Sequence, residues 1–217
     1  MMSNVRLRLG VAVLAALMAV FSGGCASPVD NVVPDSGFQA CLNSYLGHRA
    51  KAPISADMLR GLNPPNGLYC TSGTTPFGMS SGWGVRSLEG AQYLTAVAAM
   101  NFTSDGIDDL SPLGGLVNLK SLNVSKNAVT DLSPLDGLDL ASLNATDQYL
   151  GEVRGPAGKP ITLPVVIGRN GQLVVWSAPN HDATISDGQF VTAKGMTMAS
   201  WDTADGLFSG SVTVTAL

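Results

Sequence analysis

The clearest feature of the chain is a pattern of apolar positions that returns at a fixed step along the sequence. Leu110-Ser-Pro-Leu-Gly-Gly-Leu116 recurs as Leu132-Ser-Pro-Leu-Asp-Gly-Leu138, and Leu88 to Leu94 is a weaker copy that keeps the outer leucines. Similarity at a fixed step predicts one structural unit stacked on itself. The aligned apolar positions are Leu94, Leu116 and Leu138; Met100 and Leu122; Phe102 and Val124; Ile107 and Val129; the third unit, shorter by one residue, brings in Leu143, Ala145 and Leu150.

Each unit predicts a short strand and a tight return. Leu122 and Val124 alternate with polar residues, so both point inward from a strand. Asn127 is placed to satisfy backbone groups at the bend where this strand ends, and the fixed φ of the proline in Leu-Ser-Pro-Leu suits the return. Because one unit cannot bury its own leucines, the units must share a core, which predicts a leucine-rich-repeat stack over residues 85–150.

The outward positions of these strands form the expected concave face of the stack. They are small, polar and uncharged, and they lack the Trp, Tyr and Arg that usually dominate binding energy. We therefore expect either a binding face that recruits neighbours such as Lys120, or a purely structural polar ladder. Three Asn-x-Ser/Thr sequons fall on this face, and we interpret them as outward strand residues rather than glycan acceptors. The predicted face consists of Ala99, Asn101, Thr103, Ser121, Asn123, Ser125, Ser142, Asn144 and Thr146.

The N-terminus is typical of an export signal. Arg6 and Arg8 precede an apolar run from Val11 to Phe21, which is far shorter than the ~20 residues that span a bilayer. The following Ser22-Gly-Gly-Cys25 resembles the bacterial lipobox, which implies diacylation of Cys25 and cleavage before it. Ordinary signal-peptidase cleavage is the alternative, because lipoboxes usually have Leu where Ser22 stands. We expect a signal peptide at 1–24, a flexible tether at 25–37, and a lipid-anchored protein on the outer face of the cell membrane.

The remaining two cysteines, Cys41 and Cys70, predict a disulfide, since an even pair outside the cell is most simply oxidised. A nucleophilic site that pairs a cysteine with His48 is the alternative, and no flanking motif supports it. Between the cysteines, apolar spacing in residues 38–47 and 54–62 suits helix faces, and Ser55 suits an N-cap. Residues 38–84 are therefore interpreted as a helical region and a first degenerate repeat, interrupted by a Gly/Ser/Thr-rich insertion.

After Asp147 the period is lost, and the pattern changes to short alternating runs typical of strands. Several short strands in so small a region predict a β-sandwich at 151–217. Trp176 and Trp201 are interpreted as core residues rather than sugar-stacking platforms. The expected strands are Ile161–Ile167, Gln172–Ser177, Met196–Asp202 and Leu207–Ala216.

The repeats resemble those of the internalin family, whose consensus carries the same I-x-D-L-S-P-L-x-x-L-x-x-L run. That resemblance implies an α+β, solenoid fold class: a helical N-terminal cap, a short stack of 22-residue leucine-rich repeats, and a small all-β immunoglobulin-like sandwich fused to the last repeat. It also implies that the disulfide pins the cap to the stack. Adhesion or host-cell interaction is the implied role, but a fold does not transfer a ligand.

Candidate chemistry is sparse. Gly78-Met-Ser80-Ser-Gly82 matches a nucleophile elbow but lies in the insertion, without the strand and large sheet that the motif requires. His48 and His181 have no ligand partner nearby, and Asp105, Asp108, Asp109 and Asp131 form no calcium loop. With 16 acidic and 12 basic residues, the chain offers no basic face for nucleic acid. We expect no enzyme activity, no cofactor and no metal.

These inferences predict a monomeric, membrane-anchored surface lipoprotein that binds a protein or an envelope polymer through its repeat face. The alternative is a structural or assembly component of the cell's own envelope that has no host ligand.

Overall fold

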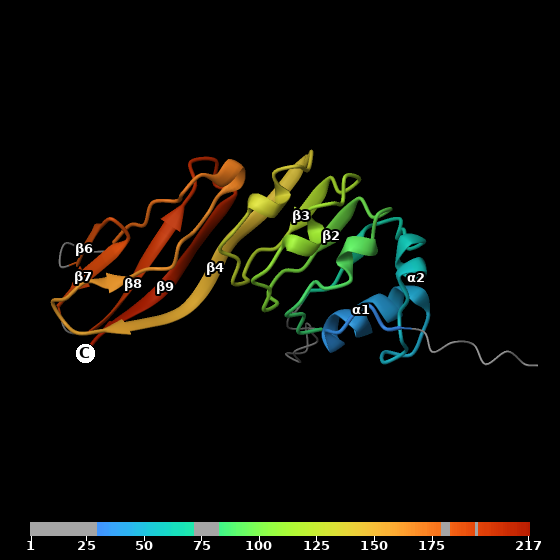
Figure 1. Cartoon of the computed structure of the whole chain (residues 1–217), viewed down its shortest axis with the longest axis horizontal. Helices are drawn as coiled ribbons and strands as arrows, with labels where there is room; N and C mark the ends of the chain where they lie inside the picture. The colour runs from blue at the N-terminus through green and yellow to red at the C-terminus, as the bar shows by residue number, and fades with distance from the viewer. Residues whose placement is uncertain (1–29, 72–82, 179–182, 194) are drawn as a thin grey trace, which may run out of the picture.

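A computed structural model describes residues 30–71, 83–178, 183–193 and 195–217. Cys25, Ser80 and His181, each singled out above, lie outside these ranges. The described chain is elongated, with two helices at one end, short strands stacked along the middle and longer strands at the other end (Figure 1). Chain order follows the long axis through the helices and the short strands. Beyond residue 155 the chain first returns to the middle, where Arg169 contacts Leu135 and Leu138, before it forms the last strands.

The two helices begin and end at well-formed caps. Helix α1 (Ser36–Leu46) starts where Asp35 accepts the backbone N–H of Phe38 at 2.7 Å and ends at Gly47, whose φ of 70° suits glycine. Helix α2 (Ala56–Arg60) starts at Ser55, whose hydroxyl accepts the N–H of Met58 at 3.3 Å. The N-cap predicted at Ser55 is confirmed.

Four parallel strands follow one another along the middle of the molecule: β1 (Leu68–Tyr69), β2 (Ala99–Asn101), β3 (Ser121–Asn123) and β4 (Ser142–Gly155). Met100 pairs with Leu122, and Leu122 pairs with Leu143. The pairing register therefore matches the predicted repeat, including the third unit, which is shorter by one residue. Three 3₁₀ turns lie next to one another between the strands: η1 (Ala91–Tyr93), η2 (Ser111–Leu113) and η3 (Ser133–Leu135).

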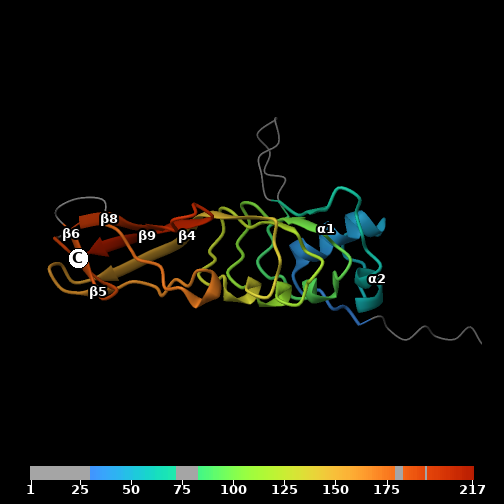
Figure 2. The same cartoon turned by 90° about the horizontal axis from the view of Figure 1, so that it is seen from above.

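Two of the C-terminal strands extend this sheet. Strand β4 continues past the repeat and pairs in parallel with β9 (Phe208–Ala216), which pairs antiparallel with β8 (Gly195–Asp202). The result is a six-stranded sheet in the order β1-β2-β3-β4-β9-β8. A second, antiparallel sheet has the order β5-β7-β6, and β5 lies across from β4 and β9 (Figure 2). Its strands are β5 (Ile161–Thr162), β6 (Ala183–Ser186) and β7 (Gln189–Thr192).

The predicted fold class is therefore wrong. We expected a helical cap, a solenoid of 22-residue repeats and a small immunoglobulin-like sandwich fused to the last repeat. The described residues are instead mostly β, with two short helices, a mixed six-stranded sheet and a three-stranded sheet. The reason lies in β4, which has 14 residues and no proline. It keeps pairing beyond the third unit, with register shifts after Ala145 and Tyr149 that turn it into the strand partner of β9.

Two of the expected C-terminal strands differ from the structure. The strand expected at Ile161–Ile167 is reduced to β5, and Gln172–Ser177 forms only isolated bridges at Leu173 and Ser177. The strands expected at Met196–Asp202 and Leu207–Ala216 are present as β8 and β9 within a residue of their predicted starts. The hairpin β6–β7 was not predicted as such, although its Asp187-Gly188 loop, with φ of 50° and 69°, carries a familiar turn signal.

One hydrophobic core runs through both halves of the described chain. Phe38 packs edge-on against Phe102 at 5.7 Å between ring centroids, which joins α1 to the parallel strands. In the C-terminal half Trp176, Trp201 and Phe208 form an edge-to-face series at 4.8 and 5.7 Å. Both tryptophans are buried, as predicted, at 8% and 2% exposed.

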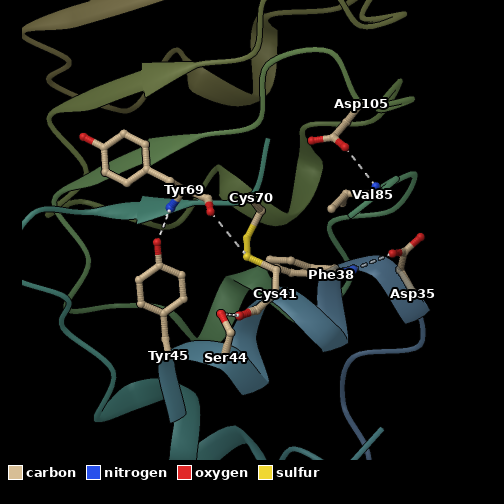
Figure 3. The surroundings of a disulfide bond; sticks show 9 residues. All are labelled: Asp35, Phe38, Cys41, Ser44, Tyr45, Tyr69, Cys70, Val85 and Asp105. Carbon is tan, nitrogen blue, oxygen red and sulfur yellow. Dashed lines mark hydrogen bonds between the residues drawn. A yellow bond between two sulfur atoms is a disulfide. The ribbon is translucent and has the colours of Figure 1, made fainter. Parts of the chain in front are cut away.

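The predicted disulfide joins Cys41 of α1 to Cys70, which directly follows β1 (Figure 3). Both residues are fully buried, and their Cα atoms lie 5.7 Å apart. Next to the disulfide, the backbone N–H of Tyr69 donates to the hydroxyl of Tyr45 at 2.9 Å. Helix α1 is thus attached to the first strand by a covalent bond and a hydrogen bond.

Removing this bond should destabilise the fold. Cys41→Ala/Cys70→Ala releases a link between residues 29 apart, which the chain-entropy model values at about 3–4 kcal/mol. Urea unfolding of the double variant and the wild type measures the difference. The interpretation fails if both proteins unfold at the same midpoint while non-reducing peptide mapping confirms the bond in the wild type.

Candidate functional site

The nine residues predicted to face outward lie in three rows across β2, β3 and β4, and we call this set the polar face. Ala99, Ser121 and Ser142 pair in register as the first row, and Asn101, Asn123 and Asn144 pair in register as the middle row. Thr103, Ser125 and Thr146 follow two positions on as the third row. Ser125 differs from the prediction, since its side chain is buried, at 5% exposed.

The middle row uses its side-chain carbonyls identically. Each Oδ1 accepts the backbone N–H of the residue two positions on, at 3.0, 3.0 and 3.1 Å, and that residue's hydroxyl, at 2.7, 2.8 and 2.9 Å. Because a backbone N–H can only donate, the oxygen of each amide must face it. The amide nitrogens therefore point the other way. The pairs are Asn101 with Thr103, Asn123 with Ser125, and Asn144 with Thr146.

Behind the polar face lies a second column, Asp105, Asn127 and Gln148, which we call the inner polar column. Asn127 accepts the backbone N–H of Ile107 at 3.1 Å and donates to the carbonyls of Phe102, Val124 and Ser125 at 2.8–3.2 Å. Gln148 occupies the same position in the next unit. It accepts the backbone N–H of Val129 at 2.9 Å and donates to the backbone carbonyls of Val124, Ala145 and Thr146. Asp105 accepts from Val85 at 3.0 Å. The role predicted for Asn127 is confirmed, and the column extends it to both neighbouring turns.

A left-handed residue stands before each member of the inner polar column. Ser104, Lys126 and Asp147 have φ of 62°, 58° and 59°, a conformation uncommon outside glycine. This kink ends each outward row and turns the next side chain into the interior. The buried hydrogen bonds of the residue that follows therefore stabilise this uncommon backbone conformation.

Tyr69 extends the middle row by one strand. It pairs in register with Asn101 on β2, and its side chain is 50% exposed. Together with the first and middle rows it lines a hollow of about 260 Å³ that contains no charged side chain. Tyr69 was not predicted from the sequence, because β1 carries no repeat motif. The signal that could have placed it is its position directly before Cys70.

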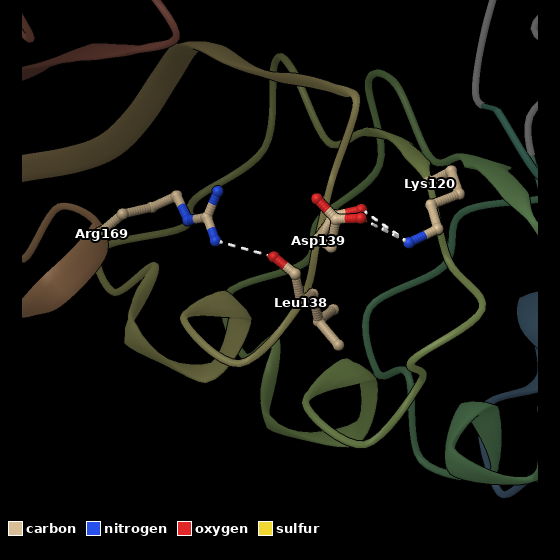
Figure 4. Close-up of polar contacts among 4 residues, drawn as sticks. All are labelled: Lys120, Leu138, Asp139 and Arg169. Carbon is tan, nitrogen blue, oxygen red and sulfur yellow. Dashed lines mark hydrogen bonds and ion pairs between the residues drawn. The ribbon is translucent and has the colours of Figure 1, made fainter.

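Charge lies beside the polar face rather than on it. The Nζ of Lys120 contacts the carboxylate of Asp139 at 2.9 Å and the backbone carbonyl of that residue at 3.1 Å (Figure 4). The hydrogen bond from Lys120, and then its charge, lower the pKa of the Asp139 carboxyl below its ordinary value. Lys120, which we expected to contribute to binding, is thus already paired with an acid.

Arg169 ties the C-terminal half to the last repeat unit. One guanidinium nitrogen donates to the backbone carbonyls of Leu135 and Leu138, both at 3.0 Å, and Figure 4 shows the second contact. The next residue, Asn170, donates its backbone N–H to Asp136 at 2.6 Å. These contacts place η4 (Arg169–Gly171) beside η3, continuing the row of 3₁₀ turns where the sequence motif has ended.

The other candidate groups have structural uses. Cys41 and Cys70 are bonded to each other, which removes the predicted alternative of a cysteine–His48 pair. Asp109 and Asp131 accept the backbone N–H groups of Ser111 and Ser133, the first residues of η2 and η3, at 2.8 and 2.7 Å. Within the described ranges no group of three His, Cys, Asp or Glu could hold a metal ion, and no helix there is long and apolar enough to cross a membrane.

The inner polar column should contribute strongly to stability. Asn127→Ala leaves the N–H of Ile107 and the carbonyl of Phe102 buried without partners, and each such group costs about 1–3 kcal/mol. We expect a loss of about 3–5 kcal/mol in urea unfolding. Asn118→Ala is the matched control, because its amide bond to Thr95 is exposed, and it should cost under about 1 kcal/mol. Equal losses for the two variants would contradict the assignment.

No protein-family model and no curated protein matches the chain. Among solved structures it is similar to the CBM51-2 and INT domains of ZmpB from Clostridium perfringens, at 20% identity and a TM-score of 0.47, over 86% of this chain and 36% of that one. It is also similar to the functional domain of InlJ and to internalin C2, both from Listeria monocytogenes. The InlJ domain matches at 12% identity and a TM-score of 0.45, over 61% of this chain and 36% of that one. Internalin C2 matches at 22% identity and a TM-score of 0.39, over 55% of this chain and 46% of that one. The chain thus spans less than half the length of each of these chains.

Proposed function

We propose that this chain is a non-catalytic, exported binding protein whose polar face is the contact surface for a partner located at a cell surface. The observation that carries the proposal is the middle row, in which three amide nitrogens point away from hydrogen bonds that fix their orientation. Such donors, held in register on rigid strands, are pre-organised for a ligand. The partner is a protein or an envelope polymer.

The surroundings of the polar face support binding rather than chemistry. No charged side chain lines its hollow, and the two described cysteines are consumed by the disulfide. The disulfide itself favours an oxidising compartment outside the cytoplasm. A role within the cell's own envelope, without a host ligand, is the second candidate, and the same disulfide is compatible with it.

Capture from two extracts tests the proposal. The immobilised chain is exposed to host-cell surface extract and to the bacterium's own envelope extract, beside a variant carrying Asn101→Arg, Asn123→Arg and Asn144→Arg. Arginine adds bulk and charge to the middle row, so we expect a partner captured by the wild type to be lost. Capture from the host extract indicates adhesion, and capture from the envelope extract indicates the second candidate.

A control variant with the same added charge places arginine at exposed positions of the C-terminal half, as Gln172→Arg, Thr184→Arg and Ala193→Arg. This control should retain the captured partner. If the polar-face variant and the control capture the same material, or if neither extract yields a partner, the polar face is not the contact surface.

We also propose that Cys25 carries a lipid anchor, on the sequence evidence of a signal followed by Gly-Gly-Cys. Two acyl chains suffice for stable anchoring, at roughly 0.8 kcal/mol per buried CH₂. The full chain produced in a bacterium should partition into the detergent phase of a phase-separating surfactant, and Cys25→Ala should move it to the aqueous phase. A wild-type protein recovered from the aqueous phase would count against the anchor.

A further inference from the structure

Four side chains form one line across the strands. Tyr69, Asn101, Asn123 and Asn144 occupy paired positions on β1, β2, β3 and β4, with neighbouring strands about 4.8 Å apart. The hollow of about 260 Å³ lies along this line, with Ser121 and Ser142 on its other side. The line therefore offers a repeated set of polar groups along one direction.

The three amides supply donors. Their Oδ1 atoms are held by backbone N–H groups, so the Nδ2 atoms point away from the turn. None of these Nδ2 atoms belongs to the buried unpaired atoms of the described chain, so solvent reaches them. A structural role for the asparagines uses their oxygens alone, and it leaves the nitrogens available to a ligand.

Hydroxyls and one aromatic ring complete the lining. Ser121, Ser142 and Tyr69 each carry a hydroxyl that can donate or accept. The half-exposed ring of Tyr69 presents an apolar surface at the end of the line. The lining carries no charge, so an ionic ligand would lose its hydration without an ion pair in return.

The ligand class follows from these properties. An extended peptide would need a free sheet edge or apolar side-chain pockets, and the polar face is the flat surface of a sheet. A neutral sugar chain has hydroxyl, ether and acetamide oxygens that accept from amides, hydroxyls that donate to serines, and C–H surfaces that pack on a tyrosine. In an extended glycan these groups recur at each ring, at a spacing close to that of the strands.

We propose that the polar face binds a neutral, extended glycan chain that lies across β1 to β4, with one sugar ring against Tyr69 on β1 and one above each of β2, β3 and β4. This inference rests on the proposed function and names its ligand class. The amide nitrogens of the middle row donate to ring substituents, and the hydroxyls of Ser121 and Ser142 accept from the opposite side.

Calorimetric titration of the intact chain with chitohexaose and cellohexaose tests the inference. Asn123→Asp keeps the Oδ1 that holds Ser125 but removes the central donor, so it should weaken binding about tenfold without changing the thermal midpoint of unfolding. Tyr69→Ala should weaken binding similarly, because it removes the stacking surface while its backbone bond to Tyr45 remains. Gln172→Glu, an exposed amide-to-acid change outside the polar face, should bind like the wild type.

The inference is overturned if neither oligosaccharide binds at millimolar concentration, or if Asn123→Asp and Gln172→Glu bind equally. Its failure differs from that of the proposed function. A protein partner captured by the wild type and lost with the arginine variant, together with silent sugar titrations, would leave the polar face as a protein-binding surface and exclude the glycan.

Discussion

The structure depends on satisfying backbone groups that each turn buries. In each of the three repeat units a left-handed residue (Ser104, Lys126 or Asp147) follows the polar face, and there the chain turns inward and leaves N–H and C=O groups without strand partners. The inner polar column satisfies them, with Asn127 bonded to Ile107 on one side and to Phe102 and Val124 on the other. Because a buried unpaired group costs about 1–3 kcal/mol, this column fixes the register that stacks the leucines and aligns the polar face.

The same constraint explains how the two halves become one body. Gln148 fills the last place in the inner polar column while lying within β4, so the turn that ends the earlier strands is here absorbed as a bulge. The strand then continues to Gly155 and pairs with β9. On the opposite side, Arg169 donates to the carbonyls of Leu135, at the end of η3, and of Leu138. The C-terminal half thereby supplies the next 3₁₀ turn.

The sequence predicted most where burial leaves one solution. Leucines that recur at a fixed step had to share a core, so the pairing of Met100 with Leu122 followed. The disulfide followed from an even pair of cysteines in an exported chain, and the two tryptophans were expected in the core. It failed where the deciding contacts are long-range. Nothing near Gln148 indicates that its amide serves Val129 rather than solvent, and the continuation of β4 depends on β9, which lies far away in the sequence. Of the candidate site, the asparagine row was predictable, whereas Tyr69 joined it only through strand pairing.

In each asparagine of the middle row, the amide oxygen stabilises the fold and the amide nitrogen faces the surface. Oxygens that hold Thr103, Ser125 and Thr146 cannot rotate outward without breaking both of their hydrogen bonds. The nitrogens are consequently fixed at strand spacing before any ligand arrives, and little side-chain entropy is left to lose on binding. Surfaces of small polar residues usually bind weakly because they lack large anchors. Here pre-organisation and repetition take the place of anchors, which suits a ligand that is itself repetitive and uncharged.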